Sequence, residues 1–102
     1  MNSEMYCWVT KYHKKKLINA FTKTHSLFFV ETLDELFSHK DSITIISLSK
    51  VTSRIILEKI INLSNPFFLE KKGWITFYMT KALESSENHF MIGVSDIHAI
   101  VT

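Results

Sequence analysis

The sequence predicts an α+β domain, in which helices occupy the middle of the chain and the two ends form an antiparallel sheet of about five strands. β-Branched and aromatic residues, which strands favour, are concentrated near both ends. The middle carries apolar residues at helical spacing, and polar turn residues separate the aromatic runs of the last third. No repeat or linker interrupts the sequence, so we expect a single domain over residues 1–102.

The composition limits the classes of function. With 46% hydrophobic residues and a net charge of +2, the chain does not have the composition of a disordered protein. Its single cysteine cannot form an internal disulfide, and no segment approaches the roughly 20 apolar residues of a membrane-spanning helix. The one dense basic run, residues 14–16, is too small for a nucleic-acid interface. We therefore expect a cytoplasmic protein that binds neither membrane nor nucleic acid.

The first 24 residues fit two structures. Residues 5–12 and 16–22 have the composition of two strands joined by a polar turn, which together form an N-terminal hairpin. Alternatively, residues 12–24 form an amphipathic helix, with Leu17 and Phe21 on its buried face. The pattern alone does not decide between them.

The middle of the chain contains two predicted helices. Thr32 is placed to cap the first, because a glutamate follows three positions later and apolar residues come next. Residues 43–48 are either a strand or a short buried helix. The second helix begins at Ser49 or Thr52 and ends before Pro66, since a residue that precedes proline avoids the helical conformation.

The last third predicts a three-stranded antiparallel meander. Its strands are residues 66–70, 74–82 and 89–95, with polar turns at 71–73 and 84–88. The long strand carries apolar side chains on both faces, which favours a partner packed on the outer face.

No catalytic or metal-binding motif is present. The five histidines are isolated from one another and are expected in turns or on the surface. Cys7 lies in an apolar segment, where a thiol acts as a small hydrophobic group. We therefore expect a protein that is not an enzyme and has no cofactor or metal.

Three stretches carry a family resemblance. Residues 5–19 are similar to an opening hairpin, and residues 36–41 are similar to a His-Pro-x-Asp segment from which the proline is missing. Residues 89–97 are similar to a closing strand followed by an Asp-Ile exit. Together they resemble a PAS domain, in particular the compact PAS-like sensor domains found upstream of diguanylate cyclases and similar signalling outputs.

The resemblance implies a sensory or interaction domain of a bacterial signalling protein. Such a domain dimerises, controls an output domain in cis or in trans, and encloses a hollow suited to a small apolar ligand. It implies that Asp96 fixes the signal exit, and that Trp8, Trp74 and Tyr78 form the dimer or partner surface. The ligand-pocket candidates, which otherwise simply fill the core, are Phe21, Phe37, Ile56, Ile60, Ile75, Phe77, Met79, Phe90 and Ile92.

The alternative is a degenerate receiver-like α/β module that regulates a protein partner. In that case residues 5–10, 27–30 and 43–48 are parallel strands. Residues 11–21 discriminate between the two, because a strand there supports the PAS-like fold and a helix supports the receiver-like one. A third interpretation, a small inhibitor from a mobile element, rests on base composition alone.

Overall fold

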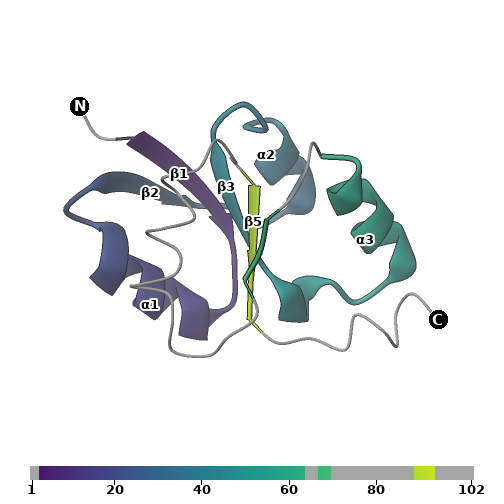
Figure 1. The fold of residues 1–102 in the computed structure, drawn as a ribbon, viewed down its shortest axis with the longest axis horizontal. Helices are drawn as coiled ribbons and strands as arrows, with labels where there is room; N and C mark the ends of the chain where they lie inside the picture. Colours follow the sequence, from purple (N-terminus) through teal and green to yellow (C-terminus); the bar gives the residue numbers. More distant parts are fainter. Residues whose placement is uncertain (1–2, 64–66, 70–88, 94–102) are drawn as a thin grey trace.

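The computed structural model describes residues 3–63, 67–69 and 89–93 (Figure 1). The described elements are, in chain order, β1 (Ser3–Trp8), α1 (Lys11–Phe21), β2 (His25–Phe29), α2 (Leu33–Phe37), β3 (Ile43–Ser47), the 3₁₀ turn η1 (Leu48–Lys50), α3 (Arg54–Ile61), β4 (Phe67–Leu69) and β5 (His89–Ile92).

The described strands form one sheet in the order β2-β1-β3-β5-β4, and every neighbouring pair is parallel. The chain forms an α+β domain, but the predicted PAS-like antiparallel sheet is wrong. The predicted N-terminal hairpin is absent, because residues 11–21 form α1. The predicted meander is wrong where it is described, since β4 and β5, its first and last strands, pair directly with each other instead of flanking a middle strand; residues 74–82 lie outside the described part of the chain.

Helix α1 forms because its local signals favour a helix over a strand. The hydroxyl of Thr10 accepts a hydrogen bond from the backbone N–H of His13 and caps the first turn. Leu17 and Phe21, four residues apart, are buried against the sheet, whereas Asn19 is exposed. A strand would have placed Asn19 on the same face as both apolar residues, so the helix is the conformation that separates them.

The predicted cap of α2 is confirmed. The hydroxyl of Thr32 accepts from the backbone N–H of Glu35 at 3.2 Å. Residues 43–47, for which the pattern allowed a strand or a helix, form the central strand β3. Ile45 and Ile46 of this strand are both buried, although they point to opposite faces of the sheet.

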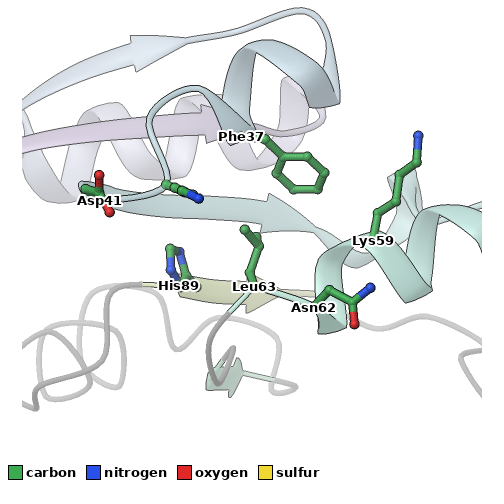
Figure 2. A pocket seen from close by; sticks show the side chains of 7 residues that line it. Phe37, Asp41, Lys59, Asn62, Leu63 and His89 are labelled. Carbon is green, nitrogen blue, oxygen red and sulfur yellow. The ribbon is translucent and has the colours of Figure 1, made fainter.

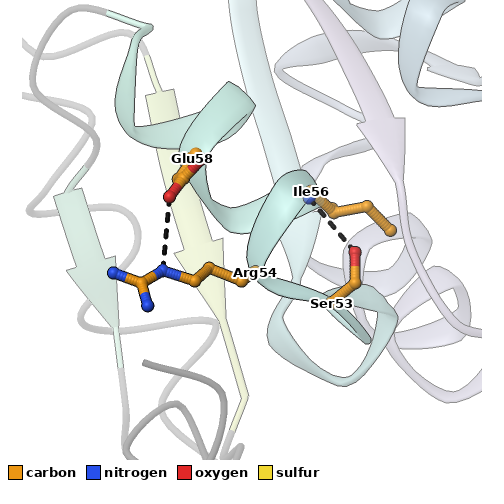
Figure 3. A network of polar contacts seen from close by, with 4 residues as sticks. All are labelled: Ser53, Arg54, Ile56 and Glu58. Carbon is orange, nitrogen blue, oxygen red and sulfur yellow. Dashed lines mark hydrogen bonds and ion pairs between the residues drawn. The ribbon is translucent and has the colours of Figure 1, made fainter. Parts of the chain in front are cut away.

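Helix α3 begins at Arg54, two residues later than the nearer of its two predicted starts. Ser53 caps it, its hydroxyl accepting from the backbone N–H of Ile56 at 3.2 Å (Figure 3). Arg54 and Glu58 form an exposed ion pair one turn apart, at 3.3 Å, which contributes about 0.3–0.5 kcal/mol. No helix in the described ranges has the length and apolar content to span a bilayer.

Both faces of the sheet are covered. The cluster on the α1 side consists of Met5, Cys7, Leu17, Phe21, Ile45, Phe90 and Ile92. The cluster on the side of α2 and α3 consists of Leu36, Ile46, Leu48, Val51, Leu57, Ile60 and Met91. Strands buried on both faces are typical of parallel sheets, and here they leave the two ends of the strands as the places where a site can form.

Candidate ligand site

The carboxyl edge of the sheet contains a topological switch point. From β1 the chain crosses through α1 to β2 on one side, whereas β3 lies on the other side of β1. The connections that follow β1 and β3 therefore lead away from each other. In open parallel sheets, ligands bind in the crevice that such a divergence opens beyond the carboxyl ends of the strands.

A polar network joins the segments at this switch point. Ser47, the last residue of β3, is fully buried, and its hydroxyl oxygen accepts from the backbone N–H of Thr10 at 3.0 Å. The same oxygen lies 2.6 Å from Nδ1 of His13. When the Ser47 hydroxyl accepts from the Thr10 N–H and donates its own proton to Nδ1 of His13, the proton of the neutral imidazole resides on Nε2. The network, to which the Thr10 hydroxyl adds a contact of 3.3 Å with the same nitrogen, thus orients the imidazole.

Gly93 extends this network to the end of β5. Its φ of +102° is in a region that side chains disfavour, and a Cβ added there would lie 2.8 Å from Cε1 of His13. The imidazole therefore packs directly on the Gly93 backbone. Burial, followed by the nearby charge of Lys16, lowers the pKa of His13 below its ordinary value, which favours the neutral ring.

A cavity of about 260 Å³ lies beside the network, at the carboxyl ends of β1 and β2. In the described part of the lining, three lysines, Lys11, Lys14 and Lys50, stand with a single carboxylate, that of Glu31. The remaining wall is mostly apolar and consists of Cys7, Val9, Phe29 and Val30. The cavity therefore has an excess of positive charge over an apolar floor, which suits a small anionic molecule. We call it the basic cavity.

Aromatic rings hold two of these lysines in place. The Lys14 ammonium lies 4.9 Å from the centre of the Phe29 ring, and the Lys50 ammonium lies 5.0 Å from the centre of the Trp8 ring. Exposed cation–π contacts contribute about 0.5–1 kcal/mol each, enough to bias the side chains toward one position. Trp8 is itself held by its indole N–H, which donates to the Glu31 carbonyl at 3.3 Å.

The groups around the basic cavity are suited to binding rather than covalent chemistry. Burial raises the pKa of Cys7 to about 12, so its sulfur is a thiol at neutral pH and not a nucleophile. Ser47 is fully buried, and its hydroxyl is engaged by Thr10 and His13. Within the described ranges, no group of three or more His, Cys, Asp or Glu side chains is placed to hold a metal ion.

A larger cavity, of about 580 Å³, lies at the opposite, amino edge of the sheet. Its lining mixes charges: Asp41 and Lys59 stand on opposite sides, with Phe37 and Leu63 between them (Figure 2). His89 closes one side of it, with Nδ1 2.7 Å from the Thr44 hydroxyl. Among the described residues the larger cavity has two lysines, Lys40 and Lys59, and one carboxylate, whereas the basic cavity has three lysines and one carboxylate. We regard the basic cavity as the better candidate, because its excess of positive charge is larger and it lies next to the switch point.

The structure does not gather the ligand-pocket candidates into one hollow. Three are buried in the cluster on the α1 side, namely Phe21, Phe90 and Ile92. Three belong to the opposite face, namely Phe37, Ile56 and Ile60. Of these six, Phe37 alone lines a cavity described above. The other three candidates, Ile75, Phe77 and Met79, lie outside the described residues.

The remaining predicted site residues are only partly described. Trp8, a predicted interface residue, is half-buried against Lys50. Trp74, Tyr78 and the predicted signal-exit residue Asp96 lie outside the described residues.

Sequence reasoning missed the polar network. Isolated histidines were expected in turns or on the surface, yet His89 lies buried in a strand and His13 is half-buried in a helix. The one local signal was the cap at Thr10, three residues before His13. No known protein-family model, curated protein or solved structure matches this chain, and its function must therefore be argued from the fold and the site.

Proposed function

We propose that this chain is a regulatory module, not an enzyme, that binds a small anionic molecule in the basic cavity and controls a protein partner or output domain. The observation that carries the proposal is the cluster of Lys11, Lys14 and Lys50 around an apolar-floored cavity beside the switch point.

Helix α1 strengthens the positive potential of this edge. The helix begins at Lys11 and has no acidic residue in its first turn to offset the partial positive charge of its amino end. The volume of about 260 Å³ is small for a ligand pocket, which favours a compact phosphate or carboxylate compound. Glu31, the only carboxylate among the described lining residues, is suited to accept a hydrogen bond from a hydroxyl or amine of the same molecule.

A ligand in this position connects two parts of the fold. Lys11 and Lys14 belong to α1, whereas Lys50 belongs to η1, which follows β3. A bound anion therefore draws together segments that leave the sheet on opposite sides of the switch point. Since residues 11–21 are helical and the described sheet is parallel, the receiver-like alternative, a module that regulates a protein partner, agrees with the fold.

The test is binding of inorganic phosphate, measured by calorimetry and by thermal unfolding against sodium chloride of equal ionic strength. We expect phosphate to stabilise the wild-type protein, and Lys14→Gln with Lys50→Gln to weaken phosphate binding about tenfold or more by removing two charged donors.

Lys59→Gln removes one positive charge from the lining of the amino-edge cavity and is the control matched to each single substitution, Lys14→Gln or Lys50→Gln. Its phosphate affinity is expected to equal that of the wild type. The proposal is wrong if phosphate fails to stabilise the wild-type protein beyond chloride, or if Lys59→Gln weakens binding as much as Lys14→Gln or Lys50→Gln does.

A further inference from the structure

Strand β2 is an edge strand without the usual protection. Within the described residues it pairs with β1 alone. Natural edge strands are commonly guarded by lysine, other charges or proline, which prevent pairing with another chain. The five residues of β2, His-Ser-Leu-Phe-Phe, include no Lys, Arg, Asp, Glu or Pro. As far as the described residues extend, this edge is therefore open to an added strand.

The direction of the peptide groups along β2 defines which residues can form backbone hydrogen bonds with an added strand. The backbone N–H of Val30 donates to the Cys7 carbonyl at 2.9 Å, so Val30 points toward β1. Peptide groups alternate in direction along a strand, and Leu27 and Phe29 therefore direct their N–H and C=O groups away from β1.

We propose that β2 pairs with β2 of a second copy of this chain, antiparallel and about a two-fold axis at Leu27. This register pairs all five residues of the strand. Leu27 has outward-facing peptide groups, so the two Leu27 residues can exchange both of their backbone hydrogen bonds, as a hydrogen-bonded antiparallel pair requires. The two joined sheets form one continuous sheet.

The charges that flank β2 are complementary in the same register. Lys23 lies four residues before Leu27 and Glu31 lies four residues after it. Lys23 lies in the turn that precedes β2 and Glu31 in the bend that follows it, so the two-fold axis brings the end of β2 next to Lys23 close to the end next to Glu31 of the partner subunit, and symmetry does this twice. Both side chains are exposed, and within the described part of the chain neither forms an ion pair.

The apolar surface at this edge also fits a second copy. Phe28 is 43% exposed and stacks on the Tyr6 ring at 5.0 Å; Tyr6 in turn stacks on His39 at 3.7 Å. In the proposed pairing Phe28 lies opposite Ser26 of the partner subunit, and the small serine leaves room for the ring. Pairing thus covers the exposed part of Phe28, whose ring is already held by stacking on Tyr6. This inference does not depend on the basic cavity binding an anion.

The experiment is sedimentation velocity across protein concentrations, with circular dichroism to verify folding. We expect the wild-type chain to dimerise. Lys23→Glu and Glu31→Lys should each weaken the dimer about tenfold, because each replaces two attractive pairs with two repulsive ones. Lys15→Glu, the same charge change at an exposed lysine of α1, is the control and should leave dimerisation unchanged.

Two further results distinguish this register from a general effect of charge. A mixture of the Lys23→Glu and Glu31→Lys proteins should form heterodimers, since both of their pairs are attractive again. Leu27→Pro removes an outward-facing N–H that β1 does not use, so the folded protein should remain monomeric.

The proposal is overturned if the wild type remains a monomer at about 0.1 mM, or if Leu27→Pro dimerises like the wild type. It is also overturned if Lys15→Glu weakens the dimer as much as Lys23→Glu, or if mixing the Lys23→Glu and Glu31→Lys proteins does not restore dimerisation.

Discussion

The two ends of β3 hold the same pair of chemical groups in different surroundings. At the carboxyl end the Ser47 hydroxyl lies 2.6 Å from Nδ1 of His13, and toward the amino end the Thr44 hydroxyl lies 2.7 Å from Nδ1 of His89. His89 is 5% exposed and belongs to the neighbouring strand, whereas His13 is half-buried at the start of a helix.

The difference lies in what each pair connects. Thr44 and His89 join two adjacent strands and complete the interior of the sheet. Ser47 and His13 join a strand to the helix that follows a different strand, and the Gly93 backbone supports the ring from a third. The same hydroxyl–imidazole pair is thus an internal link at one end of β3 and a boundary of the candidate ligand site at the other.

Among the substitutions that test this comparison, Gly93→Ala, at the carboxyl end, is expected to reduce the free energy of unfolding most. The positive φ and the approach of the new Cβ to His13 should together reduce the free energy of unfolding by about 2–4 kcal/mol. Urea unfolding measures the loss. When Gly93→Ala is made in a His13→Ala background, the part of the loss that comes from the clash with the ring should disappear, and the part that comes from the strained backbone should remain. If the losses in free energy of unfolding are strictly additive, the ring is not in contact with Gly93.

An intermediate effect is expected when each hydroxyl is removed. Ser47→Ala leaves the Thr10 N–H and the His13 ring without their shared partner, and the expected loss is about 2–3 kcal/mol. Thr44→Val keeps the shape of the side chain and removes one contact of His89, and we expect about 1–2 kcal/mol. Chemical unfolding of both variants measures the two losses. The comparison fails if Thr44→Val reduces the free energy of unfolding more than Ser47→Ala does.

The smallest effect is a dependence of stability on pH. The folded-state pKa of His13 is lowered from 6.5, so the unfolded chain takes up a proton first as the pH falls. The contribution of His13 is therefore fully present above pH 6.5 and is lost as the pH falls from 6.5 toward the folded-state pKa.

His25 has a pKa that burial lowers in the same direction, and it must be separated from His13. Urea unfolding between pH 8 and pH 5 should show a weaker pH dependence for His13→Asn than for the wild type. His25→Asn, the matched control, should retain the contribution of His13. If His13→Asn follows the wild-type curve, His13 has no part in the dependence.

The sequence contains much of this fold in local signals. The cap at Thr32 marks α2 within a residue, and the helix before Pro66 is present as α3. Strand β1 carried the signal for a parallel sheet, because Met5 and Cys7 are buried on one face while Tyr6 and Trp8 pack on the other. The prediction of an antiparallel sheet failed because the resemblance to an opening hairpin was preferred over the amphipathic helix of residues 12–24.

The candidate site was less accessible to sequence reasoning. His13 and Ser47 are 34 positions apart and belong to no motif, and only the parallel pairing of β1 with β3 brings them together. The three lysines of the basic cavity include one, Lys14, from a run that is normally interpreted as a solvated turn. Their shared position depends on the path of the chain after β1 and β3, which no local pattern specifies.

The place of β5 in the sheet has a consequence for the order of folding. β5 is the last described strand along the chain, yet it lies between β3 and β4. Strands β2, β1 and β3 can associate through contacts that span at most about 40 residues, whereas β4 pairs, in the described ranges, only with β5. Insertion of residues 89–92 is therefore the step that attaches β4 and closes the core over Ile45 and Ile46. Before that step, one edge of β3 is exposed to any other strand that reaches it, and aggregation should be most severe while β5 is not yet in place.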